Sequence, residues 1–167
     1  LSGAATDARQ IRDAILAMPM DGGPSRIVLV GYSKGTPDIL EAVVRYPEIH
    51  ERVAAVVSIA GAVRGSALAD DAEQWQAELL RDWPKSDCDA GDGGGVASLR
   101  PAIRKEWLAR NPLPANLRFY SLVALPDPDR VSRIIRGSYK KLGKIDWRND
   151  SQVIYDDAIV PGSTLLG

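Results

Sequence analysis

The sequence predicts an α/β protein with a mostly parallel sheet flanked by helices. Short runs of apolar, often β-branched residues recur along the chain, and segments with apolar residues at helical spacing separate these runs. The chain has 167 residues, of which 45% are hydrophobic and 26% are charged, as is usual for one globular domain. We therefore expect residues 1–167 to belong to a single domain.

The first part of the chain predicts a helix and then a strand–helix–strand unit. Residues 6–18 carry apolar side chains at helical spacing and end at Pro19, so they predict an amphipathic helix. The run at 26–30 suits a strand that is buried on both faces, as in a parallel sheet. A helix over 35–46 and a second strand over 53–60 complete the unit, whose two strands should be parallel.

The second part predicts more helix than strand. We expect residues 66–112 to form a helical insertion between the second and third strands, which could be a cap, with helices over 70–82 and 101–110. The third strand is expected over 117–125, and 130–142 predicts a helix or helical turn. Three tryptophans of the insertion are candidates for a cap over a site or for ordinary core packing: Trp75, Trp83 and Trp107.

Composition excludes several classes of function. Lys and Arg number 21 against 22 Asp and Glu, so there is no basic excess to bind nucleic acid. One cysteine (Cys88) and one histidine (His50) cannot form a cysteine-rich or histidine-clustered metal site. No apolar run reaches the roughly 18 residues that would cross a bilayer, and no signal-peptide pattern opens the sequence.

A G-x-S-x-G motif stands between the first predicted strand and its helix, as Gly31-Tyr32-Ser33-Lys34-Gly35. A turn that lifts a serine off the end of a strand crowds its backbone, and the flanking glycines remove Cβ atoms that would collide. The Ser33 hydroxyl would then be exposed beside the N-terminus of the helix. The Lys34 amide would point to the place where an oxyanion forms if Ser33 attacks a carbonyl.

Residues 26–62 resemble the nucleophile-elbow unit of the α/β-hydrolase family, and in particular of its lipase and esterase branch. The resemblance implies that Ser33 attacks a small-molecule ester or lipid and forms an acyl-enzyme. It also implies that the backbone N–H of Lys34 belongs to the oxyanion hole and that no cofactor is required. Gly31 and Gly35 would be the elbow glycines.

The stretch Asn149-Asp150-Ser151-Gln152-Val153 resembles the N-D-G-x-V stretch that delivers the catalytic acid in lipases. This resemblance makes Asp150 the candidate that orients the histidine, although Ser151 stands where the family has glycine. Four other acids stay open as candidates: Asp127, Asp129, Asp156 and Asp157.

The family order is serine, then acid, then histidine, but no histidine follows Asp150. His50 precedes every candidate acid and lies in a predicted helix-to-strand turn, so we interpret it as an exposed loop residue. We therefore expect a partial domain that lacks early strands and a C-terminal histidine segment, and that is inactive alone. Two alternatives stay open: a non-catalytic binding protein on a hydrolase-like scaffold, and a nucleotide-binding α/β domain.

Overall fold

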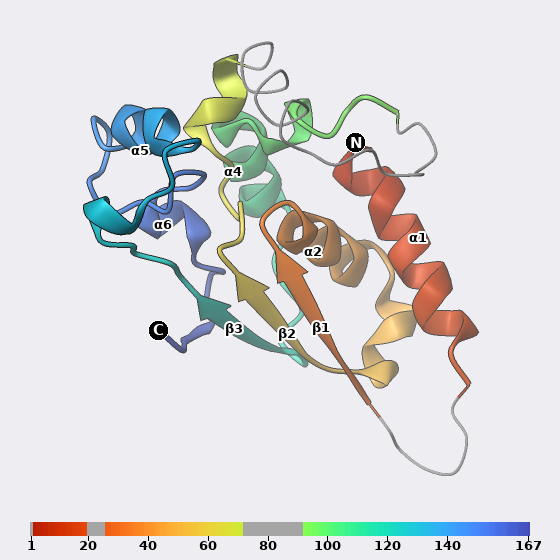
Figure 1. Cartoon of the computed structure of the whole chain (residues 1–167). Coiled ribbons are helices and arrows are strands. Elements are labelled where there is room, and N and C mark those ends of the chain that lie inside the picture. Colours follow the sequence, from red (N-terminus) through yellow and green to blue (C-terminus); the bar gives the residue numbers. More distant parts are fainter. Residues whose placement is uncertain (1, 20–25, 72–91) are drawn as a thin grey trace.

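The computed structural model describes residues 2–19, 26–71 and 92–167, and within them four strands form one all-parallel sheet (Figure 1). In their order across the sheet the strands are β1 (Ile27–Tyr32), β2 (Val53–Ile59), β3 (Arg118–Leu122) and β4 (Thr164–Leu165). The α-helices are α1 (Ala4–Ala17), α2 (Gly35–Arg45), α4 (Pro101–Arg110), α5 (Arg136–Leu142) and α6 (Tyr155–Ala158). The short 3₁₀ helices are η1 (Pro47–Arg52), η2 (Ala67–Asp71), η3 (Ala97–Leu99) and η4 (Pro128–Arg130). The predicted α/β class with a parallel sheet is confirmed.

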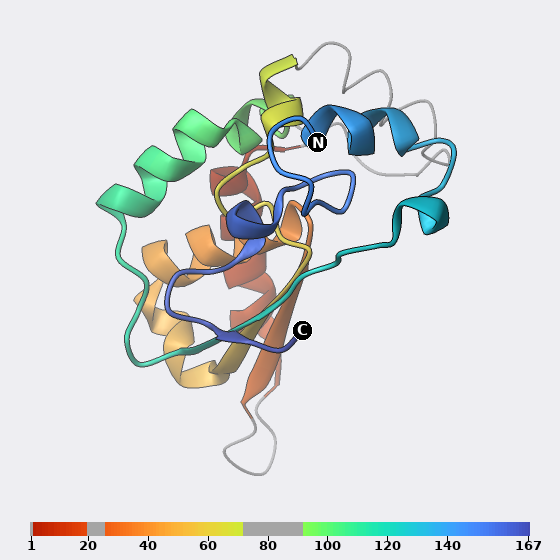
Figure 2. The same cartoon turned by 90° about the vertical axis from the view of Figure 1, so that its left-hand side faces the viewer.

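Helices α1 and α2 lie on the same side of the sheet (Figure 2). The apolar stripe of α2, which includes Leu40 and Val43, is buried against Val56 of β2 and Phe119 of β3. Ile15 of α1 joins the same core, so the sheet and two helix layers bury one continuous apolar cluster. This packing fixes the strand-to-helix junction between β1 and α2.

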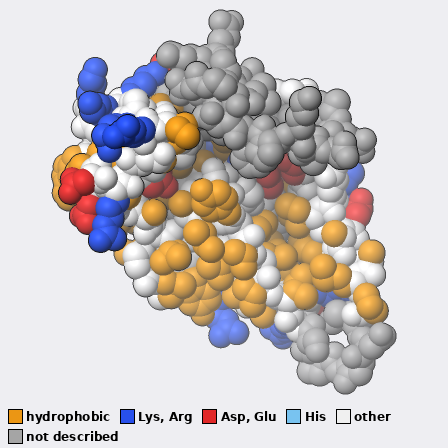
Figure 3. All heavy atoms as spheres, viewed as in Figure 1, with side chains coloured by type: hydrophobic (Ala, Val, Ile, Leu, Met, Phe, Trp, Pro, Cys, Tyr) orange, Lys and Arg blue, Asp and Glu red, His pale blue; other side chains and the backbone are white. Residues whose placement is uncertain are grey.

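The opposite face of β1 is open, which corrects the expectation of a strand buried on both faces. Val28, Val30 and Tyr32 are 54%, 57% and 70% exposed, because alternate side chains point away from the helices and no described helix covers them. Figure 3 shows hydrophobic side chains gathered over the strands on this side. The apolar run therefore predicts that the strand has apolar side chains on both faces. It does not predict which other segments pack over each face.

The segment 66–112, predicted to be a helical insertion, is described only in part. Its described elements are η2, η3 and α4, whereas most of the helix predicted over 70–82, together with Trp75 and Trp83, lies outside the described residues. Trp107 of α4 packs against the main apolar cluster, which favours core packing over a cap for this residue.

The helix predicted over 130–142 is shorter in the structure and begins at Arg136. Val131 has extended backbone dihedral angles (φ −69°, ψ 123°) and a buried side chain. Val131 is therefore a buried residue in extended backbone between η4 and α5.

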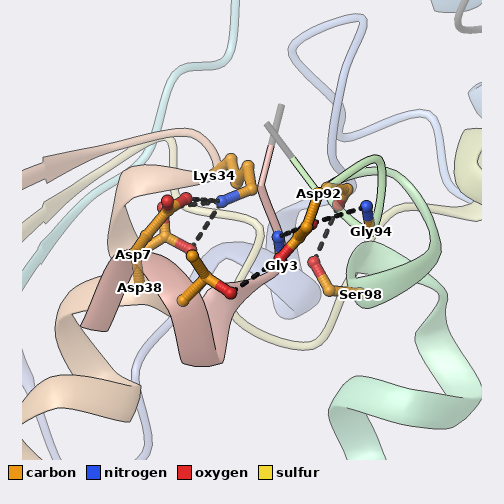
Figure 4. A network of polar contacts seen from close by, with 9 residues as sticks. Gly3, Asp7, Lys34, Asp38, Asp92, Gly94 and Ser98 are labelled. Carbon is orange, nitrogen blue, oxygen red and sulfur yellow. Dashed lines mark hydrogen bonds and ion pairs between the residues drawn. The ribbon is translucent and has the colours of Figure 1, made fainter. Parts of the chain in front are cut away.

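Asp92 fixes the N-terminus of α1 from a distant part of the chain (Figure 4). Its Oδ1 accepts hydrogen bonds from the backbone N–H groups of Gly3 (2.7 Å) and Gly94 (2.8 Å), and its Oδ2 accepts one from the Thr6 hydroxyl (2.6 Å). The hydrogen bond from Thr6, followed by those from Gly94 and Gly3, lowers the pKa of Asp92. A carboxylate here supplies the cap that the N-cap residue of α1, Gly3, cannot supply from a side chain.

Candidate active site

Ser33 lies in a tight turn between β1 and α2, with a left-handed backbone conformation (φ +50°) that is uncommon outside glycine. Its backbone N–H donates to Ile59 O (3.1 Å), and its carbonyl accepts from Thr36 N (3.2 Å) and Ala62 N (3.1 Å). These contacts attach the turn to the end of β2 and to the loop that follows it. The Ser33 side chain is half-buried, and its Oγ makes no hydrogen bond to any described residue.

The two glycines of the motif differ in what surrounds them. A Cβ at Gly31 would come 2.7 Å from both Cα and N of Thr36, so a side chain has no room there. A Cβ at Gly35 would meet no heavy atom of the described residues within 4 Å. Within the described chain, the crowding that the motif predicts is therefore present at Gly31 and not at Gly35, where the backbone has already turned away from β1 at the start of α2.

A buried polar cluster behind the turn was not predicted from the sequence. Thr36 Oγ1 donates to Gly31 O (2.9 Å) and lies 3.1 Å from Ser58 Oγ. A Cβ at Gly61 would collide with the side-chain oxygens of Ser58 and Thr36. The small residues that follow β2 in the sequence were the available signal for this close approach, and the cluster holds the turn against β2.

Lys34 presents both its amide and its side chain at the site. Its backbone N–H has no hydrogen-bond acceptor among the described residues, and it directly precedes the first residue of α2. Its side-chain Nζ contacts Asp7 Oδ2 at 2.6 Å and Asp38 Oδ1 and Oδ2 at 2.7 and 2.8 Å (Figure 4). One ammonium therefore joins carboxylates from α1 and α2. The four-residue spacing of Lys34 and Asp38 was a sequence signal for half of this network.

The charged groups at and beside the contact between Lys34 and Asp38 are buried, and burial shifts two of their pKa values. Burial raises the pKa of Asp38 from 3.8 to about 6, although the hydrogen bond and charge of Lys34 act in the opposite direction. Burial also lowers the pKa of Arg104 to about 10, while the carboxylates of Glu41 and Asp38 partly offset that effect. Arg104 Nε donates to Val63 O (3.2 Å), and its Nη2 is buried without a partner among the described residues.

Asp150 lies in the loop between α5 and α6, two helices that lie beyond the carboxyl ends of the strands (Figure 1). Its Oδ1 accepts hydrogen bonds from the backbone N–H groups of Gln152 (2.8 Å) and Val153 (2.7 Å). Burial raises the pKa of this carboxyl, and the hydrogen bonds from Val153 and Gln152 partly compensate. Oδ2 has no donor among the described residues, and no described hydrogen bond joins Asp150 to Ser33.

The four competing acids occupy different surroundings. Asp127 and Asp129 are exposed near η4, and Asp156 is an exposed partner of Arg148 at 3.1 Å. Asp157 is buried and lies 3.5 Å from Lys105 Nζ; burial raises the pKa of its carboxyl.

His50 is in η1, which leads into the amino end of β2, whereas Ser33 follows the carboxyl end of the parallel strand β1. His50 Nε2 lies 2.6 Å from Val43 O, and Nδ1 lies 3.3 Å from Asn116 Nδ2. The side chain is half-buried rather than exposed as expected, and both ring nitrogens have polar neighbours. The structure does not bring His50 to Ser33.

Among residues 2–19, 26–71 and 92–167, no group of three or more His, Cys, Asp or Glu side chains could hold a metal ion. Likewise, no helix in the described part of the chain has the length and apolar character that a membrane span requires.

Comparison with solved structures identifies the fold. A metagenomic carboxyl esterase superposes with a TM-score of 0.87 at 42% sequence identity, over 99% of this chain and 49% of the esterase chain. A Bacillus licheniformis lipase in its mature form gives a TM-score of 0.73 at 21% identity, over 99% of this chain and 65% of the lipase chain. The same lipase in its propeptide form gives 0.66 at 22% identity, over 98% and 33% of the two chains. No protein-family model and no curated protein sequence matches the chain.

The chain therefore has the α/β-hydrolase fold of carboxyl esterases and lipases, over the part of that fold that it spans. The chain spans about half the length of the carboxyl esterase, because the superposition covers 49% of that chain. The resemblance inferred from residues 26–62 is confirmed at the level of the fold.

Proposed function

We propose that this chain supplies the nucleophile and the acid of a serine hydrolase that acts on carboxylic esters. The observation that carries the proposal is the turn at Ser33. A serine with φ +50° stands between a strand and a helix, with a free hydroxyl and an adjacent amide that has no acceptor among the described residues. The 42% identity to a carboxyl esterase over nearly the whole chain supports an ester or lipid as substrate.

In the proposed reaction, Ser33 Oγ attacks the ester carbonyl carbon and a histidine takes the hydroxyl proton. The carbonyl oxygen becomes an oxyanion that the Lys34 amide stabilises. The alcohol then leaves with the proton that the histidine returns, and an acyl group remains on Ser33. Water, deprotonated by the same histidine, releases the acid and restores the serine. None of these steps needs a metal or an organic cofactor.

Asp150 is the proposed acid that orients the histidine. Backbone N–H groups hold its Oδ1, and Oδ2 has no donor in the described chain, so one oxygen is available to an imidazole N–H. The neighbouring candidates suit the role less, because Asp127 and Asp129 are exposed and Asp157 already lies beside Lys105.

The histidine itself must come from residues outside this sequence under this proposal. His50 is the single histidine of the 167 residues, and it lies at the other end of the parallel strands. The chain on its own would then be inactive. Residues 1–167 would be one part of a hydrolase domain, with 66–112 as an insertion in it.

Ester turnover by the full-length protein tests the proposal. Ser33→Ala should lower kcat on the order of 10⁶-fold, and Asp150→Asn on the order of 10⁴-fold, because these residues act as a unit. Asp127→Asn is the matched control for Asp150 and should leave kcat unchanged. If the Ser33→Ala variant still cleaves esters, Ser33 is not the nucleophile.

A non-catalytic binding protein is the second candidate, favoured by the distance in the fold between His50 and the Ser33 turn. A fluorophosphonate probe separates the two functions. A hydrolase should be labelled at Ser33 in the full-length protein and not in the isolated 167 residues. A binding protein should be labelled in neither.

A further inference from the structure

The Lys34 side chain joins three elements that meet beside Ser33. Lys34 belongs to the turn itself, Asp38 to the first turn of α2, and Asp7 to the first turn of α1. All three side chains are largely buried, with exposed fractions of 15%, 10% and 25% respectively. Ion pairs shielded in this way are screened by salt much less than surface pairs.

The position of the ammonium is unfavourable for the helix alone. The N-terminus of a helix carries a partial positive charge, so a cation directly before α2 is repelled by the dipole. Contacts of 2.6 to 2.8 Å with two carboxylates offset this repulsion. The Lys34 side chain is therefore held by Asp7 and Asp38 rather than by the helix.

The opposite side of the turn is held by different contacts. The Ser33 backbone is bonded to Ile59 O and to Ala62 N, so β2 and its following loop fix that side. The Lys34 ammonium fixes the side that faces α1. The peptide between Ser33 and Lys34 lies between these two attachments, and it carries the amide that has no acceptor among the described residues.

We propose that the Lys34 side chain is a positioning residue, which binds Asp7 and Asp38 and thereby holds the Lys34 amide in place for the oxyanion. This inference rests on the proposed hydrolase function and assigns a role to the side chain, whereas that function uses only the backbone N–H. Without the ammonium, Asp7 and Asp38 lose the partner that they share, and the contact that ties the turn to α1 and α2 is gone. Arg104 also faces Asp38, but no described contact joins it to Asp7.

The test compares Lys34→Met and Lys34→Arg in the full-length protein with a soluble short-chain p-nitrophenyl ester. The concentration of active sites is first titrated to completion with a fluorophosphonate probe, and the melting temperature is measured for each variant. Lys34→Met should lower kcat per titrated site about 10-fold with little change in KM, because the amide is displaced but not removed. Lys34→Arg keeps a charge that can reach both carboxylates and should restore kcat to within about 3-fold of wild type.

Two further variants keep the test decisive. Asp7→Asn leaves the turn and α2 unchanged and should lower kcat per titrated site by about 3-fold, even if Lys34→Met folds poorly. Lys140→Met, on the exposed surface of α5, makes the same chemical change away from the turn and should have no effect. The positioning role is wrong if Lys34→Met and Asp7→Asn keep the wild-type kcat per titrated site while only the melting temperature falls. Failure of the probe to label Ser33 in the wild-type protein would instead reject the proposed function.

Discussion

The backbone of Thr36 occupies the space that a side chain at Gly31 would need, since a Cβ there would lie 2.7 Å from Thr36 Cα and N. The last part of β1 and the first turn of α2 are therefore in direct backbone contact. The Thr36 hydroxyl strengthens this contact by donating to Gly31 O at 2.9 Å. The sharp reversal at Ser33 follows from this close approach of two elements.

Gly31→Ala should lower the free energy of unfolding by about 3 kcal/mol, because neither β1 nor α2 can move without loss of packing. Gly35→Ala is the matched control. Its Cβ would meet no heavy atom within 4 Å in the described part of the chain, so we expect no loss and a gain of about 0.5 kcal/mol from reduced chain entropy. Urea unfolding of both variants measures the difference, and equal effects of the two substitutions would contradict the steric account.

Ser151→Gly should stabilise the fold by about 1 kcal/mol. Ser151 has a left-handed backbone conformation (φ +81°), and its buried Oγ has no partner among the described residues. Glycine removes both costs. Ser138→Gly, the same change inside α5, should instead destabilise by about 0.5 kcal/mol. Thermal unfolding compares the two, and a less stable Ser151→Gly variant would show that the serine contributes a favourable contact.

The pH dependence of stability should contain a contribution from Asp38, whose pKa burial raises from 3.8 to about 6 against the opposing effect of Lys34. Asp7 adds to the raised pKa, and Arg104 opposes it. Because the folded state binds this proton more tightly than the unfolded state, the contribution is fully present below the unfolded pKa. It is lost as the pH rises through about 6.

Asp38→Asn cannot titrate and should lack this contribution. Between pH about 4 and about 7, the wild-type chain should lose about 2 kcal/mol of stability relative to the variant. Urea unfolding at the two pH values measures the difference. Asp13→Asn, which removes a surface carboxylate from α1, is the control for a general charge effect. A gain of stability for the wild type relative to Asp38→Asn over this range would contradict the direction of the pKa shift.

The open face of β1 should make the isolated 167-residue chain associate. Val28 and Val30 are more than half exposed, and they lie on β1 at the edge of the sheet. Their partners on β2, Ala55 and Val57, are also apolar. The double variant Val28→Thr and Val30→Thr keeps β-branched residues and should reduce association, as measured by light scattering after size-exclusion chromatography. Val56→Thr, on the buried face, should lower stability without reducing association. A wild-type chain that stays monomeric at high concentration would contradict this expectation.

The strand–turn–helix unit was predictable because its signals are local. An apolar run ends at Val30, the motif follows directly, and the periodicity of α2 begins within a few residues. The clash at Gly31 follows from the same local geometry. The two glycines look equivalent in the motif, and only the structure shows that the described chain crowds Gly31 and leaves Gly35 open.

Contacts between distant segments were not predictable. Asp7 reaches Lys34 across 27 positions, and Asp92 reaches Gly3 across 89 positions, so no periodicity or spacing reports them. The exposure of β1 was missed for a related reason. A run of aliphatic residues gives the apolar character of a strand, but its burial depends on which other segments pack over it.

The identity of the residue that a fluorophosphonate modifies tests the central claim most directly. The full-length protein would be treated with the probe, digested and analysed by mass spectrometry, with Ser33→Ala as the control. The account predicts one modified peptide, with the phosphonyl group on the hydroxyl of Ser33 and no labelling of the Ser33→Ala variant. A modified residue elsewhere, or a wild-type protein that cleaves esters while Ser33 stays unmodified, would contradict it.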